Sequence, residues 1–125
     1  MRFLERYSAV AYLLMRVVFA FLLMSHGYQR VFTGQAWPPF LPLGIANIIE
    51  VIVGPLLLLG LLTRPAAFIA SGEMAVAYFI AHVPRGSIIP LFNMGEITVA
   101  LCFGFLYIAT RGGGRYSIDA MRGRA

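Results

Sequence analysis

Four stretches of the chain are apolar over nearly their whole length. They run from Tyr7 to Tyr28, from Gly44 to Leu62, from Pro65 to His82 and from Leu91 to Thr110. Each is close to the roughly 20 residues that a helix needs to cross the hydrocarbon core of a bilayer. The pattern therefore predicts four transmembrane helices, which together take up most of the chain.

The segments between these stretches contain residues that interrupt helices. Pro38 and Pro39 stand between the first two stretches, and a proline inside a helix removes a hydrogen bond and clashes with the preceding turn. The connection TRP, residues 63–65, is so short that the second and third helices must be antiparallel neighbours. The glycines at 112–114 are expected to end the fourth helix.

The composition also indicates a membrane protein. Of the 125 residues, 60% are hydrophobic and only 12% are charged, which is far from the composition of a soluble domain. We predict an all-α fold, an integral membrane four-helix bundle, in which each helix satisfies its own backbone hydrogen bonds in lipid. The bundle forms a single domain over residues 1–125, and residues 111–125 form a cytoplasmic tail.

The arginines are distributed unequally between the two expected sides of the membrane. All ten basic residues are arginine, and the net charge is +5. Seven lie on the side of the termini, namely Arg2, Arg6, Arg64, Arg111, Arg115, Arg122 and Arg124. Because only Arg30 and Arg85 lie on the other side, the positive-inside rule predicts a multi-pass protein with both termini in the cytoplasm. The positive charge then suits the anionic lipid surface and needs no nucleic acid.

The sequence offers little for thiol or metal chemistry. Cys102 is the one cysteine, so an intramolecular disulfide and a CxxC pair are both excluded. The chain has no HExxH, GxGxxG, phosphate-loop or zinc-spaced pattern. We predict no metal site and no covalently attached cofactor. Axial ligation of a haem by His26 and His82 is an alternative.

Each predicted helix carries at least one ionisable residue inside the membrane. They are Arg16 in the first helix, Glu50 in the second, Glu73 in the third and Glu96 in the fourth, with His26 and His82 near helix ends. A charge at the bilayer centre costs roughly 2.5–3.5 kcal/mol on insertion scales, so these groups must be paired, neutral or hydrated. We expect them to face one another in the bundle interior.

The depths of these residues along the helices predict two polar layers. The outer layer is expected to hold Glu50, Glu96, His26 and His82, with Arg30 nearby. The middle layer is expected to contain a contact between Arg16 and one or more carboxylates. Like carboxylates in a low-dielectric site cannot all stay ionised, so at least one glutamate should hold a proton. Either histidine can also take a proton near neutral pH.

Proton-accepting groups beside apolar walls suit a quinone site, because quinone reduction and quinol oxidation move protons together with electrons. Candidate aromatic walls are Phe19, Tyr28, Tyr78, Phe79, Phe92 and Phe103. We assign proton handling to Glu50, Glu96 and His26, and binding or ion pairing to Arg16, Glu73, Arg30 and His82. Structural roles stay open, because an Arg16 ion pair can fix helix register and the histidines can lie at the membrane interface.

Several segments resemble the DoxX family of small bacterial membrane proteins. They are Arg16, HGYQR at 26–30, Glu50, LLLLGLLTRPAA at 56–67, FNMGE at 92–96 and GGGRYSID at 112–119. The resemblance covers almost the whole chain in order and spacing, and its most specific element is the last of these segments. Arg30 stands where the family usually has lysine, and Met94 where glycine is common.

The resemblance implies a protein of the bacterial inner membrane whose relatives are associated with quinone-linked oxidation. One relative is named as a subunit of a thiosulfate:quinone oxidoreductase, and others are linked to oxidative stress or quinone resistance. We predict a quinone-interacting subunit of a membrane redox system that serves oxidative-stress or sulfur and thiol oxidation. Its partners would be membrane lipid and either a redox protein or further copies of the chain. Whether the chain is itself an enzyme stays open.

Two other classes of function use the same residues. A non-catalytic membrane scaffold or chaperone would use the buried charges for packing and partner choice, and a small-ion transporter would use the same polar layer. In the tail, Tyr116, Ser117 and Asp119 are expected to cap the helix bundle. A docking surface for a soluble partner is the alternative role of these three residues.

Overall fold

The protein is all-α, as predicted. A computed structural model describes residues 1–34 and 42–124, and no strand occurs in these two ranges. The helices are α1 (Arg2–Glu5), α2 (Ser8–Phe32), α3 (Pro42–Leu59), α4 (Thr63–Ala77), α5 (Pro90–Asn93), α6 (Glu96–Arg111) and α7 (Ile118–Met121). α4 continues directly into a π-helical turn, η1 (Tyr78–His82), and a 3₁₀ turn, η2 (Val83–Arg85). The predicted break at Pro38 and Pro39 lies outside the described residues.

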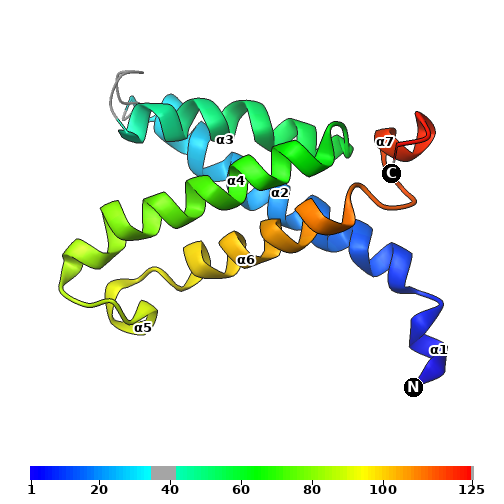
Figure 1. The fold of residues 1–125 in the computed structure, drawn as a ribbon. Coiled ribbons are helices and arrows are strands. Elements are labelled where there is room, and N and C mark those ends of the chain that lie inside the picture. Colours follow the sequence, from blue (N-terminus) through cyan, green and yellow to red (C-terminus); the bar gives the residue numbers. More distant parts are fainter. Residues whose placement is uncertain (35–41, 125) are drawn as a thin grey trace.

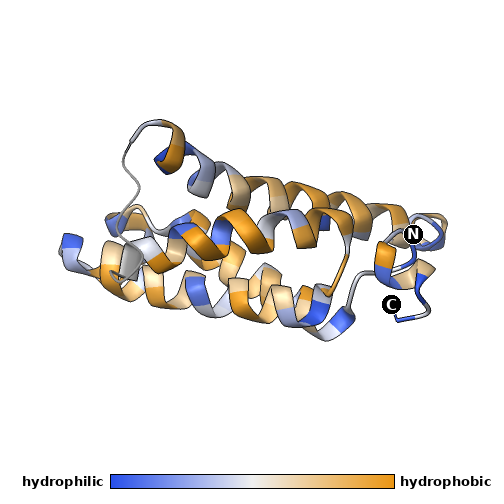
Figure 2. Ribbon diagram, turned by 90° about the horizontal axis from the view of Figure 1, so that it is seen from above, coloured by the Kyte–Doolittle hydropathy of each residue, from blue (hydrophilic) through white to orange (hydrophobic). Residues whose placement is uncertain are grey.

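The four long helices lie side by side (Figure 1). α2 packs on α3, α3 on α4 and α4 on α6, and α6 also touches α2. Helices that follow one another in the chain are therefore neighbours in space, as the short connection at 63–65 predicted for α3 and α4. Both termini lie at the same end of the long helices (Figure 1, Figure 2), beside the short helices α1 and α7.

The fourth apolar stretch is not one helix. The predicted helix over 91–110 is divided, because α5 ends at Asn93 and α6 begins at Glu96. Between them Met94 has a φ of +60°, a left-handed conformation that a continuing α-helix excludes. The Asn93 side chain fixes the break by accepting a hydrogen bond from the Gly95 N–H at 2.9 Å. Glu96 consequently stands in the first turn of α6 rather than deep inside a helix.

Two helical runs are long and apolar enough to cross a membrane. They are Ser8–Phe32, with 25 residues, and Thr63–Arg85, with 23 residues. Gly44–Leu59 is apolar but shorter. Hydrophobic residues cover most of the length of the helices (Figure 2), and the outward-facing Phe21, Phe68 and Phe103 are 62% to 66% exposed. An apolar exterior of this extent indicates a surface that another apolar medium or molecule covers.

Small and aliphatic side chains form the core between the long helices. Ala66, Ala67 and Ala70 give α4 a face without bulky groups, and each of them is buried. Small residues at such positions let neighbouring helix backbones approach closely. The larger core residues packed around this face include Leu23, Val53, Leu57, Met74, Leu101, Phe105 and Ile108.

Candidate functional site

A polar cavity of about 230 Å³ lies between α2, α3, α4 with its π-helical turn, and α6. We call it the polar chamber. Its ionisable lining residues are His26, Arg30, Glu50, Glu73, His82 and Arg85, and Thr98 adds a hydroxyl group. The side chains come from separate helices, so their convergence is a property of the fold and not of any local motif.

Glu50 is the most deeply buried carboxylate of the chamber, with a side chain that is 1% exposed. Arg30 Nη1 donates a hydrogen bond to Glu50 Oε2 at 2.9 Å and another to Asn47 Oδ1 at 3.1 Å. α2 and α3 pack closely here because Gly27 of α2 faces Glu50 of α3. An added Cβ at Gly27 would lie 2.8 Å from the Glu50 Cβ. A charge-assisted pair of this kind favours the ionised carboxylate while burial opposes it, and loss of one partner leaves an uncompensated charge.

Glu73 brings a second carboxyl group to the same place from α4. It lies close to the Glu50 carboxyl group, and Arg30 is the nearby cation for both. Glu73 is 9% exposed, and its Oε2 has no hydrogen-bond partner among the described residues. Two carboxylates and one guanidinium in a low-dielectric interior favour a state in which the carboxyl pair holds one proton. A buried proton donor therefore stands beside the Arg30–Glu50 pair.

The two histidines of the chamber differ in how many of their ring nitrogens contact other described residues. His26 Nδ1 lies 2.7 Å from the Leu22 carbonyl oxygen, which can only accept, so Nδ1 carries the hydrogen in this contact. Its Nε2 is left to exchange a proton with the chamber. His82 is held at both nitrogens, by the Asn93 carbonyl oxygen at 3.3 Å and the Thr98 hydroxyl at 3.1 Å. His26 is thus the better placed of the two for proton transfer.

The π-helical turn at the end of α4 holds His82 in position. π-helical turns are rare, and many occur at functional sites. Asn93 stabilises this one, because its Nδ2 donates to the Tyr78 hydroxyl at 3.0 Å and to the Ser87 carbonyl oxygen at 2.9 Å. The Tyr78 hydroxyl in turn donates to the Ile88 carbonyl oxygen. The wall of the chamber around His82 is therefore rigidly connected to the segment before α6.

Glu96 does not join the chamber. It is exposed in the first turn of α6 and is absent from the lining of both cavities described here. The predicted convergence of Glu96 with Glu50 is therefore wrong. The reason is the helix break at Met94 and Gly95, which places Glu96 at a helix terminus where an acidic side chain interacts favourably with the helix dipole.

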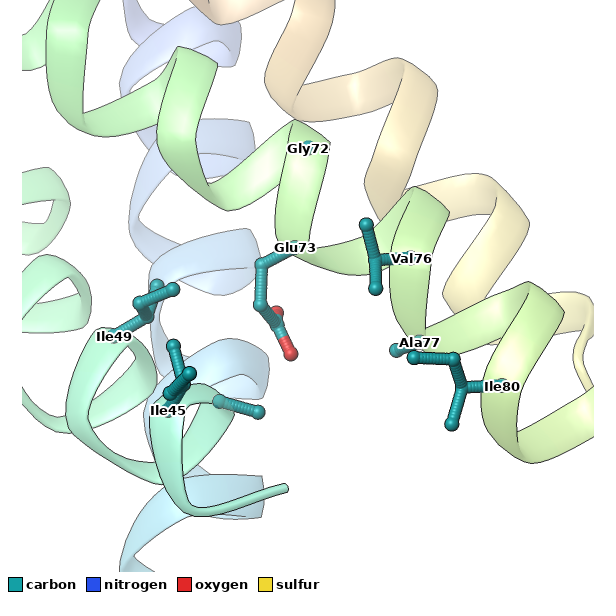
Figure 3. Close-up of a pocket in the computed structure, with 8 residues that line it drawn as sticks. Ile45, Ile49, Gly72, Glu73, Val76, Ala77 and Ile80 are labelled. Carbon is teal, nitrogen blue, oxygen red and sulfur yellow. The ribbon is translucent and has the colours of Figure 1, made fainter. Parts of the chain in front are cut away.

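An apolar cavity of about 390 Å³ adjoins the chamber between α3 and α4. We call it the α3–α4 groove. It is lined by Ile45, Ala46, Ile49, Gly72, Glu73, Val76, Ala77 and Ile80. Figure 3 shows the Glu73 carboxyl group pointing between the isoleucines of α3 and the apolar side chains of α4. Glu73 lines both cavities and is the one ionisable residue in the lining of the groove.

The walls of these cavities are aliphatic rather than aromatic. The sequence suggested six aromatic residues as walls, and none of them lines the chamber or the groove. Phe79, Phe92 and Phe103 instead point outward and are between 61% and 68% exposed. They add to the apolar exterior of the helices.

Arg16 does not line the chamber and forms no salt bridge with any carboxylate of the described residues. The predicted contact of Arg16 with a glutamate is therefore wrong. Arg16 is 2% exposed, and its guanidinium donates to main-chain carbonyl oxygens. The acceptors are Leu57 at 3.0 Å, Leu58 at 3.4 Å, Tyr116 at 3.0 Å and Gly113. Arg16 thus joins the end of α3 to the tail.

The tail caps the bundle, as predicted. The Asp119 carboxylate accepts hydrogen bonds from the Leu62 N–H at 3.0 Å and the Thr63 N–H at 2.9 Å, the backbone donors at the start of α4. Burial by itself would raise the pKa of Asp119, but hydrogen bonds from Thr63 and Leu62 and the nearby Arg122 charge hold it below its ordinary value. We call the contacts of Arg16 and Asp119 the tail junction, and we assign it a structural role.

The structure adds residues that the sequence did not single out. Asn47 stands one turn before Glu50 on α3, a spacing that places both side chains on one helix face and could have marked it. Thr98 and Gly72 carry no comparable local signal, because their positions depend on how α4 and α6 pack. Arg85, predicted only as a loop residue, lines the chamber and is exposed.

Comparison with known proteins identifies relatives over most of the chain. The model of the DoxX family matches residues 11–83. A curated protein of Haemophilus influenzae, described as an uncharacterized protein, is 35% identical over 127 aligned positions, or 93% of this chain and 93% of that protein. No solved structure matches the chain. The matched family segment contains the chamber residues His26, Arg30, Glu50, Glu73 and His82.

Proposed function

The chain belongs to the DoxX family, whose members are membrane-associated, and from this and the polar chamber we propose that it binds a quinone as a subunit of a membrane redox system. The system would serve oxidative-stress or sulfur and thiol oxidation in the bacterial inner membrane. The chain would cross that membrane as a bundle of α2, α3, α4 and α6.

One observation carries the proposal. Glu50 and Glu73, from different helices, meet beside Arg30 in an interior cavity, and the second carboxyl group opens onto an apolar groove. Such residues are expensive inside a membrane and are usually retained for function. A quinone ring with its apolar substituents needs this combination of an apolar surface and a few groups that exchange protons.

The chemistry requires both electrons and protons. A quinone that takes up two electrons and two protons becomes a quinol, and the reverse reaction releases both. In our proposal the chamber handles the protons, with the Glu50 and Glu73 carboxyl pair and His26 Nε2 as the exchanging groups. Arg30 is paired with Glu50, so we assign the shared proton to Glu73 in this proposal. A partner redox protein that carries a flavin, a haem or another electron carrier supplies or removes the electrons.

The position of the chamber suggests the side from which protons arrive. His26 and Arg30 lie in the last turns of α2, and His82 lies at the far end of α4, so the chamber is near the end of the bundle opposite the termini. If the excess of arginines places the termini in the cytoplasm, the chamber is on the periplasmic side. We therefore propose that the chamber exchanges protons with the outer face of the membrane, where exposed Arg85 marks its rim.

Infrared difference spectroscopy tests this function on the purified chain in lipid nanodiscs with a bound quinone. Electrochemical reduction of the quinone is expected to change the carbonyl stretch of a protonated carboxyl group, because the proton held by Glu50 and Glu73 moves to the ligand. Glu73→Gln is expected to abolish this carboxyl band, and Glu50→Gln to shift it, since each removes one member of the pair.

The matched control is Glu5→Gln, which makes the same substitution at an exposed position of α1 and should leave the band unchanged. Glu96→Gln tests the separate sequence-based assignment of a proton role to that residue. A carboxyl band that survives both chamber substitutions would refute proton transfer by the chamber. A chain that binds no quinone at all would instead favour the scaffold function.

A further inference from the structure

The α3–α4 groove has the features of a subsite for an apolar chain. Seven of its eight lining residues have no ionisable group, and the groove follows α4 and then η1 from Gly72 to Ile80. Over that distance a helix rises about 12 Å. Ile45, Val76 and Ile80 are each about half exposed, so the groove opens on the outer surface of the helix pair, where a membrane would place lipid.

Gly72 is an unusual glycine in this fold. A Cβ at Gly54 would collide with Met24, and one at Gly104 would collide with Phe19, so these two glycines permit close helix packing. A Cβ at Gly72 would meet nothing within 4 Å. Glycine in a helix interior costs roughly 0.5–1 kcal/mol relative to alanine, and here no neighbouring atom requires it. Its effect in the structure is to leave the wall of the groove without a side chain.

The inner end of the groove has a polar atom without a partner. Apart from the proton that the Glu50 and Glu73 carboxyl groups share, the buried Glu73 Oε2 has no hydrogen-bond partner among the described residues, and its carboxyl group faces the groove (Figure 3). Buried polar atoms are nearly always hydrogen-bonded, so an unpaired one points to a missing partner. A protonated Glu73 can donate to a carbonyl oxygen, and an ionised one can accept from a hydroxyl group.

The carboxyl groups beside the groove favour a neutral membrane ligand over an anionic one. The phosphate of an anionic lipid placed at this position would face the carboxyl groups of Glu73 and Glu50, while Arg30 is already paired with Glu50 and Arg85 lies at the exposed rim of the chamber. A neutral ring with carbonyl or hydroxyl oxygens meets no such repulsion. The aliphatic walls suit a long hydrocarbon tail attached to that ring.

We propose that the α3–α4 groove is the access route and the tail-binding subsite for a long-tailed quinone, which slides in from the bilayer past Gly72 until its ring oxygen reaches Glu73. This inference rests on the proposed function and adds to it the direction of access and a ligand with a long apolar tail. It also assigns a specificity role to Gly72, where an added Cβ would meet no other atom within 4 Å.

The test is whether quinone binding depends on the hydrocarbon tail of the quinone. Dissociation constants are measured in nanodiscs for one benzoquinone ring with a long alkyl chain and for the same ring with a methyl group. Gly72→Leu fills the groove, and we expect it to weaken binding of the long-tailed quinone about tenfold while the methyl compound changes less than about twofold. Val76→Phe narrows the same groove from an exposed position and should have the same selective effect.

Ala100→Leu is the matched control, because it adds the same side chain at an exposed position of α6 that lines neither cavity. It should leave both dissociation constants unchanged. The inference is overturned if Gly72→Leu and Val76→Phe weaken both compounds equally or affect neither. Failure of the wild-type chain to bind either compound would overturn the proposed function itself.

Discussion

Arg16→Gln is expected to lower the free energy of unfolding by about 3 kcal/mol or more, because buried carbonyl oxygens would lose their donors. The guanidinium joins the end of α3 to the tail through four of them, and a glutamine amide cannot reach all four. The variant should also release the tail, which exposes the start of α4. Denaturant-induced unfolding of the purified protein in detergent micelles measures the first effect, and limited proteolysis of the tail measures the second.

Arg2→Gln makes the same substitution at an exposed position of α1 and should change stability by less than about 0.5 kcal/mol. Arg16→Lys should fall between the two, because an ammonium group keeps the charge but lacks the planar fork of donors. An Arg16→Gln protein as stable as the wild type would show that the tail junction does not hold the bundle together.

Arg30→Gln is the second substitution with a large expected effect. It leaves Glu50, with a side chain that is 1% exposed, without its cation and should cost about 1–3 kcal/mol. The low end of that range is expected, because the Arg30 side chain is 28% exposed and water screens part of the interaction. Thermal unfolding in nanodiscs measures the loss.

The double variant Arg30→Gln with Glu50→Gln separates the pair from simple loss of packing. Because it removes both charges, it should be more stable than Arg30→Gln alone, and a double-mutant cycle should give a coupling energy of about 1 kcal/mol or more. Additive effects of the two substitutions would mean that the Arg30–Glu50 contact is not an energetically significant pair in the protein.

Much of the fold could be predicted from hydrophobicity alone. Apolar stretches, prolines and glycines define the four long helices, because each helix must bury or shield an apolar surface over its length. The break between α5 and α6 escaped prediction, since Asn93 is a single polar residue between Phe92 and Met94 in an apolar stretch that is also compatible with a helix. Only the left-handed backbone at Met94 and the Asn93 contacts reveal it.

The candidate site could be predicted only in part, because the contacts of some residues depend on tertiary packing. The cost of buried charge correctly indicated that Glu50, Glu73, His26 and His82 face a common interior. The same reasoning failed for Arg16, because it considered only carboxylates as partners and overlooked the free carbonyl oxygens at a helix end. Which interior each charge faces depends on the packing of distant segments, and no local pattern encodes that packing.

The central claim is that the Glu50 and Glu73 carboxyl groups form one interior site that the α3–α4 groove connects with the bilayer. The most direct test is photolabelling of the protein in native membranes with a photoreactive long-tailed quinone, followed by peptide mapping by mass spectrometry. We predict labels on the groove segments, residues 45–49 and 72–80, which excess unlabelled quinone should suppress. Labels confined to the outer faces of α2 and α6, or labels that excess quinone does not reduce, would contradict the claim.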